Sequence, residues 1–207
     1  MSRRREPDDA GVSLIEILVT LSVMSVVMVV ATTGILQTYR TLAATESAAQ
    51  GQAELRRVYQ RLDKEVRYAS WVALPAKVGS AWYVELAVGG NWCRQLRFDT
   101  VAKVLQMRRW AAGSPPAADQ AWQVVGSSLV VDGSAPPFQR EDVNTMPYAN
   151  PNPTLDAGAD FAPDYYRLRV RLAADTSRVA ARLDGTFSAL NTSRNTAGLN
   201  TCSEGRP

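Results

Sequence analysis

The carboxylate of Glu16 stands inside the long apolar run Val12–Leu36, which contains no other charged side chain. An ionisable group on an apolar helix costs about 2.5–3.5 kcal/mol at the middle of a membrane, and less near the interface. Two separate charges in a low-dielectric medium are more costly than one ion pair. The chemistry expected of Glu16 is therefore the neutralisation of a cationic group.

The rest of the chain offers little material for catalysis. It contains no histidine, which excludes Ser-His-Asp and Cys-His arrangements. It has no P-loop, no GxSxG elbow, and no GxGxxG between a strand and a helix. Two cysteines without histidine do not make a metal site. We expect a protein that is not an enzyme and that needs no cofactor or metal.

The run around Glu16 is predicted to form a helix that can cross a membrane. Its about 25 residues at about 1.5 Å each span about 37 Å, enough for a bilayer with some tilt. The preceding segment is short and charged, and its Arg3–Arg5 cluster favours a cytoplasmic N-terminus. A secretory signal peptide has small residues after its apolar part, whereas Ala10 and Gly11 come before it here.

This arrangement resembles the leader of type IV prepilins and of the pseudopilins of type II secretion. In that family a membrane peptidase cuts after the glycine, the new N-terminal residue is N-methylated, and the fifth mature residue is glutamate. The resemblance implies a leader at residues 1–11, cleavage between Gly11 and Val12, methylation at Val12, and an assembly role for Glu16. The chain has Val12 where the family usually has Phe or Met. A plain single-pass anchor, with Glu16 reaching to the interface, is the alternative.

Residues 37–70 are predicted to continue the same helix into water. Alanines in its first half are strong helix formers. An apolar stripe then recurs at three- and four-residue steps, through Leu55, Val58, Tyr59, Leu62, Val66 and Ala69. Arg61–Glu65 and Asp63–Arg67 have the spacing of helical ion pairs. Gly51 is interpreted as a glycine that the helix merely tolerates.

Residues 71–207 are predicted to form a β-rich globular domain. Apolar and polar side chains alternate over the expected strands 82–88, 92–98, 104–110, 122–131, 166–172 and 178–190, with a bulge or turn at Asp184–Gly185. Such alternation indicates an antiparallel sheet with one buried face and one wet face, and the tryptophans are expected in its core. The proline-rich segment 134–163 is predicted to be a loop. The fold class is α+β and pilin-like: a long N-terminal α-helix, transmembrane in its N-terminal half, packed on an antiparallel β-sheet domain.

Cys93 and Cys202 are the chain's two cysteines. In a domain that the resemblance places outside the cytoplasm, they are expected to form one disulfide that ties the C-terminal tail to the sheet. Two unpaired thiols are the alternative.

The resemblance implies a minor pilin or pseudopilin, similar to larger minor pilins and to J-type or W-like members of the family. Its partners would be other pilin or pseudopilin subunits, the prepilin peptidase and the membrane. The machine stays open among a pilus, a type II secretion system and a competence apparatus. The alternative is a filament-tip adhesin or DNA receptor that uses Ser134–Pro163 and the strand face of Arg167, Arg169 and Arg171. A net charge of +3 does not argue for a dedicated nucleic-acid binder, and we interpret the arginines as a solvated face.

Overall fold

The computed structural model describes residues 13–89, 91–117, 119–143, 164–176, 181–193, 202 and 205–206. The chain divides into two compact units, Met1–Glu46 and Ser47–Pro207. Helix α1, Leu14–Arg67, contributes residues to both. Gly11 and Val12 lie outside the described residues, as does most of the predicted loop 134–163.

The described part of the second unit contains two antiparallel sheets. The strands are β1 (Ala69–Val72), β2 (Ala76–Val78), β3 (Ala81–Val88), β4 (Trp92–Asp99), β5 (Val104–Ala111), β6 (Gln123–Gly126), β7 (Leu129–Val131), β8 (Phe138–Glu141), β9 (Arg167–Ala174) and β10 (Arg182–Ser188). The first sheet has the order β1–β3–β4–β5–β6, with β2 paired to β3. The second has the order β10–β9–β7, with β8 paired to β9. The α+β fold class predicted from the sequence is confirmed.

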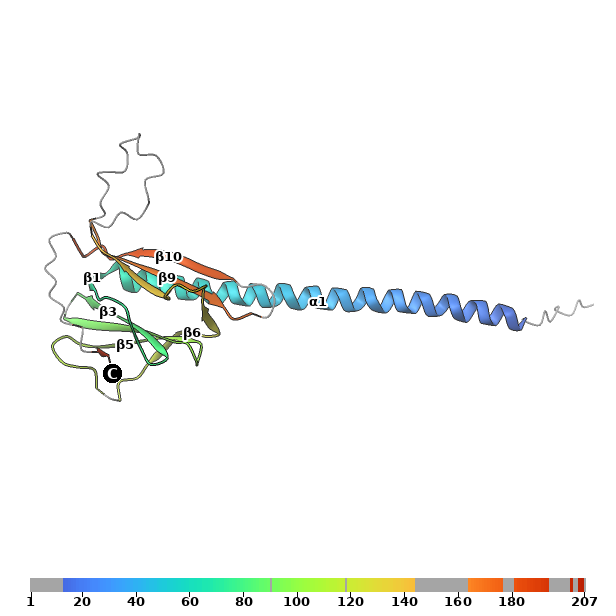
Figure 1. Cartoon of the computed structure of the whole chain (residues 1–207), viewed down its shortest axis with the longest axis horizontal. Coiled ribbons are helices and arrows are strands. Elements are labelled where there is room, and N and C mark those ends of the chain that lie inside the picture. Colours follow the sequence, from blue (N-terminus) through green and yellow to red (C-terminus); the bar gives the residue numbers. More distant parts are fainter. Residues whose placement is uncertain are drawn as a thin grey trace, which may run out of the picture. The chain divides into compact units, whose positions relative to one another are not determined.

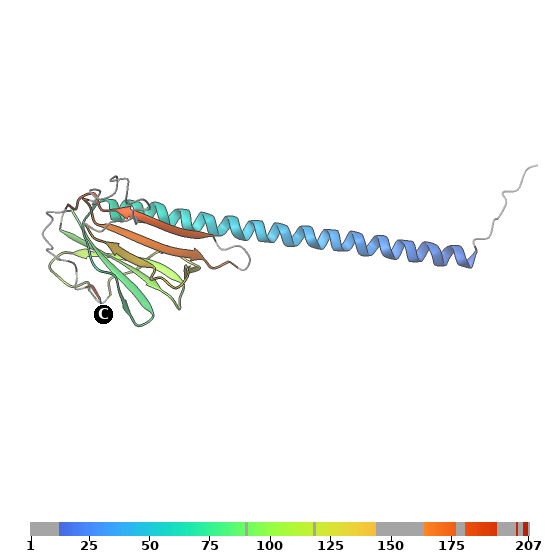
Figure 2. The ribbon, with the colours of Figure 1, turned by 45° about the horizontal axis from the view of Figure 1, so that its top comes forward.

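The core of the second unit joins both sheets to the apolar stripe of α1. Leu55, Val58, Leu62 and Val66 of the helix are buried, and they share one cluster with strand residues of each sheet. Those strand residues include Val84, Leu86, Leu96, Phe98 and Leu105 from the first sheet and Leu168, Val170 and Leu172 from the second. Figures 1 and 2 show both sheets lying against this part of α1. Full burial of each Val or Leu contributes about 1.5–3 kcal/mol, so packing, more than helix propensity, holds this segment helical.

Gly51 is required by close packing, which corrects its interpretation as a tolerated glycine. A Cβ at this position would lie 2.9 Å from the Cβ of Ala174 and 3.1 Å from Cγ2 of Thr176. Both neighbours belong to the chain just at and after the end of β9, where the sheet comes against the helix. The sequence shows a glycine in a helix but does not show which strand passes over it.

Three predictions about the strands are wrong in detail. Segment 122–131 is two strands in different sheets, because Ser128 between them takes a left-handed φ of 52°. Part of the predicted loop 134–163 is β8, anchored by the buried side chain of Phe138 opposite Val170. Asp184–Gly185 continues β10 without a bulge, in register with Arg171 and Val170 of β9.

The outer face of the first sheet is not wet as predicted. Cys93, Gln95 and Glu85 point away from the α1 side of their strands, and all three are fully buried. Residues of the C-terminal tail contact this face: Cys202 clusters with Cys93 and Trp110, and the carbonyl of Gly205 accepts hydrogen bonds there. The strand alternation was read correctly, but a second layer covers the face that it assigned to solvent.

The tryptophans divide between core and surface. Trp110 is buried beside the two cysteines, and Trp82 packs partly against the main core. Trp92 is 41% exposed, against the expectation of a core position, and the guanidinium of Arg109 lies 4.4 Å from its ring centroid. An arginine stacked on an indole lets the ring stay at the surface while half of it is shielded.

Candidate functional site

Glu16 lies in the first turn of α1. The backbone carbonyl of Ser13 accepts hydrogen bonds from the amides of Glu16 (2.9 Å) and Ile17 (3.2 Å), which begins the helix. A carboxylate in the first turn interacts favourably with the helix dipole. The side chain of Glu16 is exposed, and it makes no ion pair within the described residues. Its charge is therefore available to a group outside this chain's described part.

The helix around Glu16 carries an uncovered apolar surface. Leu14, Ile15, Val26, Val30 and Ile35 are all more than half exposed. By length and composition, α1 is the one helix in the described residues that could cross a membrane, with an 18-residue window of mean hydropathy 2.5. A surface this apolar is stable in contact with lipid or with other apolar helices, because exposure of it to water is unfavourable.

Most hydroxyl side chains in this stretch donate hydrogen bonds to backbone carbonyls of their own helix. The hydroxyl of Ser22 donates to the carbonyl of Leu18 (2.8 Å), that of Ser25 to Leu21 (2.7 Å) and that of Thr33 to Val29 (2.9 Å). Such bonds satisfy a hydroxyl without water, which an apolar medium requires. Glu16 is thus the one charged side chain of this surface among the described residues, and no ion pair neutralises it there.

A second charged cluster lies inside the β-rich unit. Glu65 of α1 is only 2% exposed and pairs with Arg94 of β4 and with Arg61, whose Nε is 3.0 Å from Oε1. Glu65 occupies a buried position beside the apolar stripe, and Arg94 lies on the apolar face of β4. The sequence offered a signal for the contact between Glu65 and Arg94, because it places an acidic residue beside the apolar stripe of the helix and a basic residue on the apolar face of the strand. The sequence analysis did not predict this contact.

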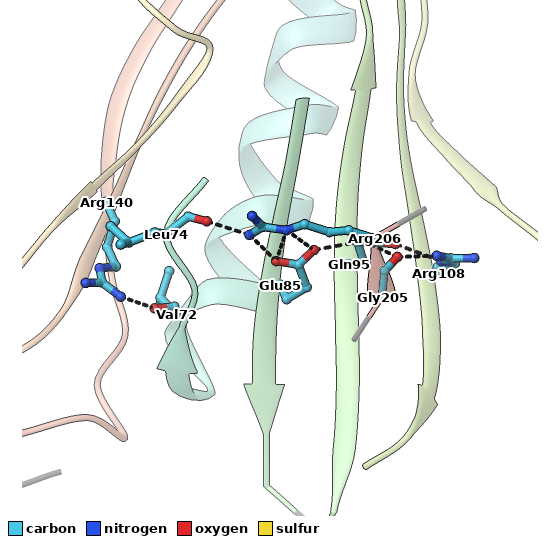
Figure 3. A network of polar contacts seen from close by, with 8 residues as sticks. All are labelled: Val72, Leu74, Glu85, Gln95, Arg108, Arg140, Gly205 and Arg206. Atoms are coloured by element: carbon cyan, nitrogen blue, oxygen red, sulfur yellow. Dashed lines mark hydrogen bonds and ion pairs between the residues drawn. The ribbon is translucent and has the colours of Figure 1, made fainter. Parts of the chain in front are cut away.

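The C-terminal tail forms a polar network on the outer face of the first sheet (Figure 3). Arg206 donates to both carboxylate oxygens of Glu85 and to the carbonyl of Leu74. Gln95 donates to the carbonyl of Gly205 (2.6 Å), which also accepts from Arg108 (2.5 Å). Buried polar groups are stable only when they are paired in this way. No sequence pattern predicts this network, because it joins the tail to residues 97 to 132 positions earlier in the chain.

The structure joins Cys93 of β4 to Cys202 by a disulfide across 109 residues. Trp110 and the partly buried Ala87 and Ala112 pack around it. The disulfide at Cys202 and the contacts of Gly205 and Arg206 therefore act jointly to attach the C-terminal tail to the first sheet.

The arginines proposed as a strand face have hydrogen-bond or ion-pair partners within their own sheet. Arg169 makes two hydrogen bonds of 2.7 Å to the carboxylate of Asp184. Arg167 lies 3.0 Å from Glu141, and Arg171 donates to Gln139 at 2.8 Å. The hydrogen bonds that Arg169 donates to Asp184 lower the pKa of Asp184 and raise the pKa of Arg169. Because these three guanidiniums already have partners, they are less available to bind an external anion.

Residues 7–32 match the family model described as the prokaryotic N-terminal methylation motif. This segment contains Gly11, Val12 and Glu16 and all of the apolar run except its last four residues. No curated protein and no solved structure matches the chain. The chain carries a type IV prepilin-like N-terminal signal, followed by an apolar helix and antiparallel sheets. Such a signal points to a structural subunit that is anchored in a membrane, processed by a prepilin peptidase and assembled with other pilins.

Proposed function

We propose that this protein is a minor pilin or pseudopilin, a structural subunit that helps to assemble or cap a pilus or pseudopilus filament. The precursor is cut after Gly11 and methylated at Val12, and the helix 12–36 then enters the filament. The observation that carries the proposal is the methylation motif at residues 7–32. Within it Glu16 is exposed, and it has no ion pair among the described residues, in the first turn of an uncovered apolar helix.

The charge balance gives Glu16 its role in this proposal. Cleavage leaves a charged α-amino group on Val12, at the apolar end of the helix. The carboxylate of Glu16 in a neighbouring subunit neutralises that group, which replaces two isolated charges by one pair in a low-dielectric medium. Because the carboxylate and the amino group must meet, this ion pair fixes how far one helix is shifted along the filament axis relative to its neighbour.

The proposed location follows from the same helix. The precursor sits in the inner or cytoplasmic membrane with a cytoplasmic N-terminus and an extracytoplasmic β-rich domain, and it moves into the filament after processing. Its partners are the prepilin peptidase and other pilin or pseudopilin subunits of a pilus, a type II secretion system or a competence apparatus. The alternative, a filament-tip adhesin or DNA receptor on the same anchor, draws no support from Arg167, Arg169 and Arg171, since these side chains are engaged within the sheet.

Replacement of Glu16 tests the proposal. Glu16→Ala should lower the amount of the subunit in a sheared filament fraction by about tenfold or more, which corresponds to the loss of about 1.4 kcal/mol per contact. Its level in the membrane should stay unchanged. Glu46→Ala, which removes another exposed glutamate from the same helix, is the matched control. Normal incorporation of Glu16→Ala would contradict the proposal and leave the helix as a plain anchor.

A further inference from the structure

A cavity of about 500 Å³ lies within the β-rich unit, beside α1 and the ends of β4, β5 and β6. Its charged lining residues are all arginines: Arg61, Arg94, Arg108 and Arg109. No carboxylate is among the described residues that line it. Arginines from α1, β4 and β5 thus line one space, a composition that suits an anionic ligand.

The arginines of this cavity outnumber the acids that could neutralise them. Glu65 is the one carboxylate paired with any of the four in the described residues, and it is shared by Arg61 and Arg94. Arg108 bonds only to neutral acceptors, at 2.8 Å to Oε1 of Gln95 and 2.5 Å to the carbonyl of Gly205. Among the described residues, the arginines that line the cavity therefore outnumber the carboxylates paired with them.

Arg109 is the most available of these cations. Its guanidinium lies 4.4 Å from the ring centroid of Trp92, and it makes no ion pair within the described part of the chain. Arg109 is exposed, and Trp92 is 41% exposed at the same rim. Stacking on the indole fixes the plane of the guanidinium while its N–H groups remain free to bind an acceptor.

The electrostatics agree with this geometry. Burial, followed by the neighbouring charges of Arg61 and Arg109, lowers the pKa of Arg94. Burial likewise lowers the pKa of Arg108. A bound anion would relieve this repulsion, because an opposite charge nearby favours the charged form of a guanidinium.

The surroundings favour a peptide carboxylate over a nucleic acid. A nucleic-acid strand needs basic side chains that follow its phosphates over several nucleotides. Here the excess charge is confined to one cavity, and the arginines on β9 are engaged with Glu141, Gln139 and Asp184. The amides of Gln120 and Gln123 line the same space and suit peptide groups. The cavity also adjoins β6, which ends its sheet, and an extended peptide can pair with a strand at a sheet edge.

We infer that this arginine cavity is a docking site for an acidic, extended peptide segment of a partner protein, with one carboxylate bound by Arg109 at the rim and by the cavity's other guanidiniums. Guanidinium groups bind carboxylates through paired hydrogen bonds, which gives direction as well as strength. The inference does not depend on the filament role, because the binding is a property of the β-rich unit alone.

The test is fluorescence anisotropy of labelled hexaglutamate with the full chain in detergent micelles. Hexaglutamine of the same length measures binding that does not need charge. Arg109→Gln removes the cavity arginine whose side chain makes neither an ion pair nor a hydrogen bond among the described residues. Arg57→Gln is the matched control. Arg57 lies on α1, the helix that carries Arg61, its side chain is 78% exposed, and it does not line the cavity. Circular dichroism spectra of both variants should equal that of the wild type.

We expect hexaglutamate to bind at least about tenfold more tightly than hexaglutamine at low salt. Arg109→Gln should weaken hexaglutamate binding about fivefold or more, because it removes a charged donor of hydrogen bonds to the carboxylate. Arg57→Gln should change it less than about twofold. Equal binding of the two peptides, or equal effects of the two substitutions, would overturn the inference. So would tighter, Arg109-dependent binding of labelled oligothymidylate, which would assign the cavity to phosphates.

Discussion

Arg206, at the C-terminal end of the described chain, lies against Glu85 of β3, with 2.5 Å between Nη2 and Oε2. Glu85 is fully buried, and 121 residues separate the two partners (Figure 3). A carboxylate removed from water loses several kcal/mol of solvation, which only a close cation and further hydrogen bonds offset. Gly205 and Arg206 are therefore part of the packed structure of the domain.

Removal of Arg206 should destabilise the β-rich domain. Arg206→Gln leaves the buried charge of Glu85 without its cation, a change that typically costs about 3 kcal/mol or more. The double variant Glu85→Gln/Arg206→Gln should lose less, because it leaves no isolated charge. Chemical denaturation of the full chain in micelles, followed by near-UV circular dichroism, measures both. Equal stability of Arg206→Gln and the wild type would show that the pair contributes nothing.

Loss of the disulfide should release the same tail. A covalent link that closes a loop of about 100 residues contributes up to about 4.7 kcal/mol by restricting the unfolded chain. Cys93→Ala/Cys202→Ala should therefore lower the melting temperature, and the emission of Trp110, now covered by the tail, should shift to the red. The reduced wild type is the companion sample. If neither spectrum nor melting temperature changes on reduction, the tail is held without the disulfide.

Alternation and periodicity in the sequence are enough to predict the α+β class, the apolar stripe of α1 and most strands of the first sheet. They record which side of an element is apolar, and burial largely follows that pattern. They do not record what covers the polar side. Glu85 and Gln95 were assigned to a wet face because the tail that buries them lies more than 100 residues further along the chain.

The missed pair Glu65–Arg94 has the same origin. Each residue interrupts an apolar pattern on its own element, and each interruption is explained only by the other. Gly51 was likewise misjudged because its partner, Ala174, belongs to a strand more than 100 residues away. The local pattern of apolar and polar residues thus predicts the helix and the strands, but the specific contacts between residues far apart in the sequence are known only from the structure.

Substitution of Gly51 should separate helix propensity from packing. Alanine is favoured over glycine in a helix by about 1 kcal/mol, yet a Cβ at position 51 would lie 2.9 Å from that of Ala174. We expect Gly51→Ala to destabilise the β-rich unit by about 1–2 kcal/mol, as overpacking does. Gly34→Ala is the control, because nothing lies within 4 Å of its would-be Cβ. Denaturation midpoints of the two variants compare the sites, and a stabilised Gly51→Ala would refute the close contact.

Acidification should weaken the contact between β9 and β10. The pKa of Asp184 is lowered chiefly by the hydrogen bonds from Arg169, and burial opposes this only in part. Because the folded pKa lies below the unfolded one, the stabilisation is complete above the unfolded pKa of about 4. It is lost as the pH falls through the lower folded value. NMR titration of the Asp184 carboxyl should give a midpoint below 3.8 in the wild type.

The titration has its own control. In Arg169→Gln the midpoint should rise towards the ordinary value, whereas Lys103→Gln, which removes a cation paired with Asp175 instead, should leave it in place. An unchanged midpoint in Arg169→Gln would mean that the pair does not persist in solution.

The central claim, that this chain is a processed filament subunit, is tested most directly by mass spectrometry of its N-terminal peptide. The protein should be extracted from the membranes of cells that contain an active prepilin peptidase. The account predicts a mature chain that begins at Val12 with a methylated α-amino group. A chain that retains residues 1–11 intact in such cells would contradict it.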